Sequence, residues 1–248
     1  MMRPVSGRIS FTYISSAGFT LVELMVAMIL GLLAAGLFYR SYGVLAGAAG
    51  QQDQLVEQGH NLRVGINQLA RDLRMAGYNP LWSGGVETGF LVAEADTLRF
   101  TRDLDGDAAI SADYEDVSYR LSGPGANGAF SLQRQDFNGA TDAIVDNVDA
   151  LNFVYLDGHG APLSQPVDGR MAITAPPVTD YDQIRMVEIT MVVRTTNEDY
   201  SYLDNICYRN NRDSDGDGMN DVVLSPRGDH FRRRAVTALV KPRNLGRS

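Results

Sequence analysis

The longest apolar stretch of the chain runs from Phe19 to Tyr39. In this stretch, FTLVELMVAMILGLLAAGLFY, 17 of the 21 residues are apolar and Glu23 carries the only charge. As a helix it would extend ~31 Å, which matches the ~30 Å hydrocarbon core of a bilayer. The pattern therefore predicts one membrane-spanning helix over residues 19–39.

Glu23 separates three interpretations of this segment. The apolar region of a cleaved secretory signal is about 7 to 15 residues long, shorter than this one, although the small residues 46–50 would suit a cleavage site. A simple anchor would not contain a carboxylate, because an unpaired acid in a membrane costs about 2.5 kcal/mol or more. We therefore expect Glu23 to have a positively charged partner.

The helical pattern continues beyond the apolar segment. One face of residues 51–76 carries a recurring set of apolar residues, namely Leu55, Leu62, Ile66, Leu69 and Leu73. Gly77 and Pro80 provide a stop signal, so a single helix is predicted over 19–76. Its glycines predict local melting or a bend near residues 43–50, and its apolar face predicts packing on the protein's own head.

The junction before the apolar helix carries a recognisable motif. The string Gly18-Phe19-Thr20-Leu21-Val22-Glu23 resembles the prepilin signal of type IV pilins and pseudopilins. The resemblance implies that a prepilin peptidase removes residues 1–18 by cutting after Gly18. The new amino terminus at Phe19 would then be methylated, and Glu23 would pair with the terminal amine of a neighbouring subunit. Residues 69–78, LARDLRMAGY, are similar to the end of the long helix in PilW-type minor pilins.

Beyond residue 77 the pattern changes to short alternating runs separated by turn residues, which is typical of antiparallel strands. The predicted strands are residues 86–92, 97–102, 117–121, 130–135, 150–156, 184–195 and 233–240. We therefore expect an α+β fold, in which the long helix packs on an antiparallel sheet in a head of residues 77–248. The segments 157–181 and 196–230 are predicted to be irregular. A G-x-G-x-x-G string at 123–128 lies between two predicted strands and indicates a hairpin loop.

The strongest candidate for a ligand site is an acidic loop at residues 213–221. Its acids occupy positions 1, 3, 5 and 9 of a calcium-loop pattern with Gly218 at position 6, and the predicted ligands are Asp213, Asp215, Asp217, Met219 and Asp221. Position 12 is Leu224 instead of a glutamate, so Asp204, Asp229 or water would have to complete the site. We expect calcium to order the loop over 196–230.

A second acidic loop is a weaker metal candidate. Asp103, Asp105 and Asp107 have the same spacing, with Asp113, Glu115 and Asp116 downstream, but Ala108 replaces the glycine at position 6. The pattern here favours a solvated turn.

Composition narrows the function classes. The net charge of −8 disfavours a nucleic-acid binder, and Cys207, the single cysteine, cannot form an intramolecular disulfide. In strand 233–240 alternation divides Arg232, Arg233 and Arg234 between two faces, which favours ion-paired or solvated side chains over a phosphate site. The three histidines lack metal or catalytic spacing, so no enzyme activity is expected.

The resemblance implies a minor pilin of a type IV pilus. Such a protein would be an inner-membrane precursor with its head in the periplasm, and would then enter the filament near its tip to prime assembly. Its partners would be the prepilin peptidase, other pilins and the inner-membrane assembly platform. A minor pseudopilin of a type II secretion system and a membrane-anchored extracytoplasmic binding or adhesion protein are the alternatives.

Overall fold

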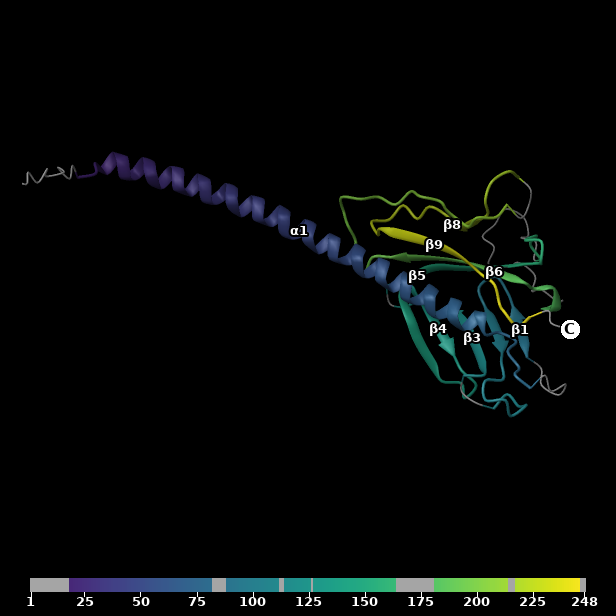
Figure 1. Cartoon of the computed structure of the whole chain (residues 1–248). Coiled ribbons are helices and arrows are strands. Elements are labelled where there is room, and N and C mark those ends of the chain that lie inside the picture. The colour runs from purple at the N-terminus through teal and green to yellow at the C-terminus, as the bar shows by residue number, and fades with distance from the viewer. Residues whose placement is uncertain are drawn as a thin grey trace, which may run out of the picture. The chain divides into compact units, whose positions relative to one another are not determined.

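A computed structural model describes residues 18–81, 88–111, 114–125, 127–163, 181–213 and 217–245, without the side chains of 44–49. The chain forms two compact units, one ending at Gly50 and one covering Gln51–Ser248. Helix α1 (Leu21–Arg74) contributes its first part to one unit and its second part to the other (Figure 1). It stays helical through residues 43–50, so the predicted local melting is not observed.

The first unit consists of the apolar part of α1. Residues Leu21–Gly43 form a helix long and apolar enough to cross a membrane, with a mean hydropathy of 2.4 and no buried residue. Apolar side chains that are fully exposed in water would be costly, and a bilayer removes that cost. The segment fits the predicted membrane span and extends it by a few residues.

The second unit is a head with its own core. Its sheet contains β1 (Gly89–Ala93), β2 (Leu98–Thr101), β3 (Asp116–Leu121), β4 (Phe130–Gln135), β5 (Thr141–Leu156), β6 (Met186–Arg194) and β9 (Arg233–Val240). These strands are hydrogen-bonded in the order β1-β2-β3-β4-β5-β6-β9, and every pair is antiparallel. A short 3₁₀ turn, η2 (Tyr181–Gln183), precedes β6.

The second part of α1 covers one face of this sheet (Figure 1). Leu62, Leu69 and Leu73 are almost completely buried there, against residues such as Phe100 and Met191 of the sheet. Four of the five residues of the predicted apolar face are therefore buried on the head, whereas Leu55, nearest the first unit in sequence, is 39% exposed. Residues 51–74 therefore pack within the same compact unit as the sheet, Gln51–Ser248, as the apolar face of the helix predicts.

The sheet curls towards closure at one end. The β1–β2 turn folds back so that the Ala95 carbonyl accepts a hydrogen bond from the Phe153 N–H of β5, at 2.7 Å. After β9 the chain returns to the end of α1, where the Arg243 N–H donates to the Arg74 carbonyl at 3.2 Å. Leu245 then packs beside Gly77 and Gly89, whose positive φ angles of 75° and 134° suit glycine.

The opposite face of the sheet carries a second, smaller apolar cluster. Strands β7 (Tyr208–Arg209) and β8 (Val222–Leu224) form a two-stranded ribbon. Tyr208, Val223 and Leu224 pack there on Ala150 and Val192 of the main sheet. The predicted α+β class is confirmed, and the segment 196–230 is more regular than its composition suggests.

Candidate functional site

The start of α1 contains the predicted cleavage junction between Gly18 and Phe19. Gly18 and Phe19 are exposed, and Thr20 precedes the first helical residue, Leu21. The Thr20 hydroxyl oxygen accepts a hydrogen bond from the Glu23 N–H at 3.2 Å, and the Thr20 carbonyl accepts one from the Leu24 N–H. Residues 1–17 of the predicted leader lie outside the described residues.

This geometry gives Glu23 a second role beside the expected pairing. Threonine at the N-cap with glutamate three residues later forms the pattern of a capping box. A carboxylate in the first helical turn also interacts favourably with the positive end of the helix dipole. Sequence reasoning missed this role, although the string Thr20-Leu21-Val22-Glu23 carries the signal.

At the other end of α1, Asp72 is the centre of a buried polar network. Its carboxylate pairs with Arg134 at 3.0 Å and Arg102 at 3.4 Å, and accepts a 2.7 Å hydrogen bond from the Tyr119 hydroxyl. Burial, followed by the charge of Asp72, raises the pKa of Tyr119, so this hydroxyl stays protonated and donates. The network holds α1 to β3, to β4 and to Arg102, the residue that directly follows β2.

A second network surrounds Arg233, whose side chain is 1% exposed. The guanidinium pairs with Asp149 at 2.6 Å, Asp204 at 2.8 Å and Asp229 at 2.5 Å. Burial alone would lower the pKa of Arg233, but its hydrogen bonds to Asp229 and Asp204 raise it overall. Arg232 pairs separately with Asp199 at 2.7 Å, while Arg234 is exposed.

The Arg233 network corrects the predicted role of Asp204 and Asp229. Both were candidates for the missing calcium ligand of the 213–221 loop. Each carboxylate is instead paired with Arg233, and Asp204 also accepts long hydrogen bonds from the hydroxyls of Tyr202 and Tyr208. The segment 196–230 is thus held by buried ion pairs and the β7–β8 ribbon, which the sequence pattern does not predict.

The first acidic loop connects β7 to β8. Asp213, Asp217, Met219 and Asp221 are described, whereas Asp215 lies outside the described residues. Gly218 has a φ of 82°, and its N–H donates to the Asp213 carboxylate at 2.9 Å. The Met219 N–H donates to Asp217 at 2.7 Å. The tight turn at position 6 is the conformation that a calcium loop requires.

The base of this loop is fixed by contacts to the sheet. Arg212 pairs with the buried Glu188 of β6 at 2.9 Å. The Asp221 N–H donates to the Arg212 carbonyl at 2.5 Å, which closes the loop. Asn210 bonds to Asn152 of β5 and to the Asp221 carboxylate. These contacts therefore fix the chain next to the first acid of the loop, Asp213, and at its last acid, Asp221.

In the second acidic loop, three carboxylates form a compact cluster, although the sequence pattern favoured a solvated turn. Oxygens of Asp103, Asp105 and Glu115 all lie within 4.8 Å of one another, and Asp103 and Glu115 are fully buried. Ala108 adopts a positive φ of 63°, so an alanine takes the conformation that we expected only of glycine. Asp107 bonds to the Ala109 N–H at 2.8 Å and is not part of the cluster, and Asp113 lies outside the described residues.

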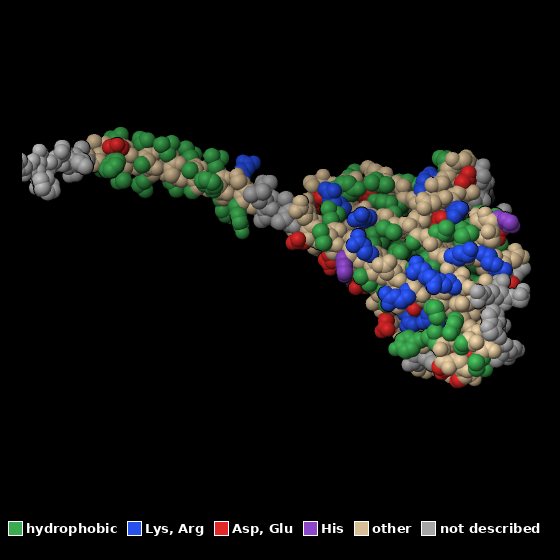
Figure 2. Space-filling view, in the orientation of Figure 1, with side chains coloured by type: hydrophobic (Ala, Val, Ile, Leu, Met, Phe, Trp, Pro, Cys, Tyr) green, Lys and Arg blue, Asp and Glu red, His purple; other side chains and the backbone are tan. Residues whose placement is uncertain are grey.

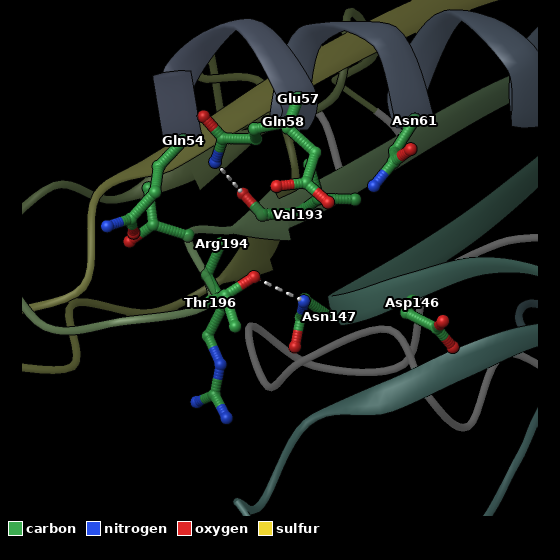
Figure 3. Close-up of a pocket in the computed structure, with 10 residues that line it drawn as sticks. Gln54, Glu57, Gln58, Asn61, Asp146, Asn147, Val193, Arg194 and Thr196 are labelled. Atoms are coloured by element: carbon green, nitrogen blue, oxygen red, sulfur yellow. Dashed lines mark hydrogen bonds between the residues drawn. The ribbon is translucent and has the colours of Figure 1, made fainter. Parts of the chain in front are cut away.

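A shallow polar depression lies beside the second part of α1 (Figure 3). It is lined by Gln54, Glu57, Gln58 and Asn61 of the helix, and by Asp146, Asn147 and residues 193–196 of the sheet and the following loop. The buried Gln58 amide donates to the Val193 carbonyl at 2.7 Å and to the Arg232 carbonyl at 3.0 Å. Asn147, with a φ of 57°, donates to the Thr196 hydroxyl at 3.2 Å.

Comparison with known proteins bears on the N-terminal region and on the fold. Residues 15–39 match the family described as the prokaryotic N-terminal methylation motif. No curated protein matches the chain. Among solved structures, the type IV-like pilin TTHA1219 from Thermus thermophilus is similar, with 14% identity and a TM-score of 0.46. That match covers 76% of this chain and 97% of the other, and a likeness of this size does not assign a function.

The motif at residues 15–39 includes the Gly18–Phe19 junction and Glu23, and it leads into the apolar part of α1. The head that follows is an antiparallel sheet with a helix on one face. The chain therefore carries a prokaryotic N-terminal methylation motif at the start of its apolar helix.

Proposed function

We propose that this protein is a minor pilin of a type IV pilus. In this proposal the prepilin peptidase removes the leader, and the mature subunit enters the filament near its tip and primes assembly together with other pilins. The observation that carries the proposal is Glu23 inside an apolar span that begins directly after the Gly18–Phe19 junction. A carboxylate in that position favours a protein whose helix meets a cation from a neighbouring subunit.

Substitutions at Glu23 test this role and separate it from helix capping. Glu23→Gln keeps a side chain that can serve in a capping box but removes the charge, whereas Glu23→Val removes both. We expect both variants to be inserted and processed, because neither adds a cost in the membrane. Both should be depleted from sheared filaments, as measured by immunoblotting against the whole-cell level. Normal recovery of Glu23→Gln in sheared filaments would mean that the side chain at residue 23 acts only in capping the helix.

The alternative function is a minor pseudopilin, which would serve a type II secretion system instead of a type IV pilus. Deletion of the gene separates the two. Loss of surface filaments with normal exoprotein secretion supports the minor pilin, and the reverse result supports the pseudopilin. A complemented strain that expresses the unmutated chain serves as the control.

We also propose that calcium binds the acidic loops of the head. Asp213, Asp217 and Asp221 come from a loop with a fixed base, and Asp103, Asp105 and Glu115 form a compact set of oxygens. Carboxylate oxygens are the ligands that calcium prefers, and extracellular sites often bind at ~10⁻⁴ to 10⁻³ M. Because Arg233 and the β7–β8 ribbon already hold the rest of segment 196–230, calcium would act on the loop tip alone.

A further inference from the structure

The head carries opposite charges on the two sides of α1. Six exposed cations lie on α1, on β9 or just after β9, and we call them the basic flank: Arg63, Arg71, Arg74, Arg234, Lys241 and Arg243. Figure 2 shows Lys and Arg side chains gathered there, and a row of Asp and Glu side chains along the opposite side of the helix. Among the described residues, none of the six cations lies within 4.0 Å of a carboxylate.

Contacts place the basic flank along the seam between α1 and the edge strand. The Arg234 guanidinium lies 3.3 Å from the position that a Cβ atom on Gly59 would occupy, so it covers the helix one turn before Arg63. Arg243 lies at the end of the helix, where its N–H bonds to the Arg74 carbonyl. These contacts place Arg234 beside the head's part of α1 and Arg243 beside the end of that helix.

The opposite side holds the depression of Figure 3, which contains the carboxylates of Glu57 and Asp146. Glu57 is exposed, and Asp146 accepts only a hydrogen bond from the Ser131 hydroxyl at 2.7 Å among the described residues. The surrounding amides are already fixed by the bonds of Gln58 and Asn147. The lining also contains Arg194, which is buried and pairs with Asp149 at 3.5 Å, so the depression presents the carboxylates of Glu57 and Asp146 beside a cation that already has a partner.

We propose that the Glu57–Asp146 depression receives an arginine side chain from the basic flank of a second copy of this chain. Arginine suits the site because its planar guanidinium donates several hydrogen bonds to carboxylates and amide oxygens at once. The contact joins different patches on the two copies, so it is heterologous. This inference rests on the proposed assembly of the chain into a filament.

Cysteine cross-linking of the full chain in membranes tests the contact. In a Cys207→Ser background, one tagged copy carries Asn61→Cys at the depression and a differently tagged copy carries Asn67→Cys on the basic side of α1. We expect a short bismaleimide to join the two tags. The matched control replaces Asn67→Cys by Ser225→Cys, an exposed position outside the basic flank. Equal cross-linking at Ser225 would overturn the proposal.

Charge reversal then tests the chemistry. Arg63→Glu with Arg74→Glu on the second copy should reduce cross-linking at least about tenfold, because like charges then meet. Adding Glu57→Arg and Asp146→Arg to the first copy should restore it. Reversal of Arg120 and Arg227, which lie elsewhere, is the control for net charge. Cross-linking that ignores the reversal, or that joins only a different protein, contradicts the proposal.

The result is independent of the filament assay. A chain that enters filaments without this cross-link would refute the contact and leave the minor pilin proposal standing. A cross-link that forms while the chain never enters filaments would support self-association and refute the minor pilin proposal.

Discussion

At the scale of single residues, Asp72 has the clearest energetic consequence. Asp72→Asn would leave Arg102 and Arg134 buried without their common counter-charge. Removal of one partner of a buried ion pair costs about 3–5 kcal/mol, so the free energy of unfolding of a soluble 51–248 fragment should fall by that amount. Urea denaturation measures the change. Asp116→Asn, which breaks the more exposed pair with Arg99, should cost only about 0–1 kcal/mol.

If Asp72→Asn and Asp116→Asn destabilise the head equally, the Asp72 network does not hold α1 to the sheet. The fragment is a valid test system because the buried residues of the described chain all lie between Gln58 and Pro242. Asp72 lies near the end of the helix and is the only acidic residue of the string LARDLRMAGY, residues 69–78. The same string contains the buried Leu69 and Leu73 and the exposed Arg71 and Arg74.

Asp229 makes stability depend on acid pH. Its hydrogen bond from Arg233, opposed by burial, lowers the pKa of the Asp229 carboxyl in the folded head. A group with a lowered folded-state pKa stabilises the protein above its unfolded pKa of about 3.9, and this contribution is lost as the pH falls through the folded-state pKa. Asp199 adds to the trend, because hydrogen bonds from Ser201 and Arg232 lower its pKa.

We therefore expect Asp229→Asn to be less stable than the unmutated fragment at pH 7 and to approach it in stability as the pH falls below about 4. Urea denaturation series between pH 7 and pH 2 measure the two curves. Asp142→Asn, on an exposed part of β5, is the control and should run parallel to the unmutated protein. Parallel curves for Asp229→Asn as well would mean that its ion pair does not contribute to acid sensitivity.

At the scale of elements, the hydrophobic pattern of the sequence predicted those helices and strands that depend on local sequence alone. The membrane span, the apolar face of α1 and the limits of β4 and β9 follow from alternation or from a 3.6-residue repeat. The first half of β5 was missed because Asn147, with positive φ, and a bulge near Val148 interrupt its alternation. Strands β7 and β8 are too short to be predicted from pattern, and they form because they pack on Ala150 and Val192.

The candidate sites show the same contrast between features that follow from local sequence and features that depend on contacts between distant segments. Acid spacing indicated both loops, since ligand pattern is local. The convergence of Glu115 with Asp103 was not predictable, because it depends on how β3 pairs with β2. The pairing of Asp204 and Asp229 with Arg233 depends on contacts between distant segments, and no spacing rule connects them.

Calcium should stabilise the loops without being required for the fold. A ligand that binds only the folded state stabilises it by about 2.7 kcal/mol when its free concentration is 100 times the dissociation constant. With weak binding and millimolar calcium, we expect a smaller rise in the melting temperature of the 51–248 fragment relative to chelator. Asp215→Ala with Asp217→Ala removes one loop, and Asp105→Ala with Glu115→Ala removes the other.

These two double variants assign the effect to a loop. Magnesium at the same concentration is the control for ionic strength, since it prefers a smaller and more rigid site. An unchanged melting temperature in the unmutated fragment, together with no heat of binding in calorimetric titration, would leave both loops as solvated turns. A large unfolding transition on chelation would contradict the limited role proposed for calcium, because the Arg233 network should persist.

At the scale of the whole molecule, charge and apolar surface are strongly separated. The apolar segment 19–39 contains only Glu23 as a charged residue, while the head carries the acidic excess and the basic flank. Removal of residues 1–18 takes away Arg3 and Arg8 and no acidic residue, so 20 basic residues remain against 30 acidic ones. The side-chain charge then moves from −8 to −10, and the cleaved end gains a new amine beside the membrane-spanning helix.

We expect the mature protein to begin at Phe19. The peptidase would cut after Gly18, and methylation of the new terminal amine would add one methyl group to the mass of chain 19–248. Intact-mass measurement and N-terminal sequencing of protein from membranes determine both. Cleavage of Gly18→Ala should be inefficient, and the bulky Gly18→Leu should not be cut. Ala17→Gly is the control and should be cut normally. A mature terminus near Gln51 would instead indicate ordinary signal-peptidase cleavage, which would remove Glu23 with the apolar segment and contradict the minor pilin proposal.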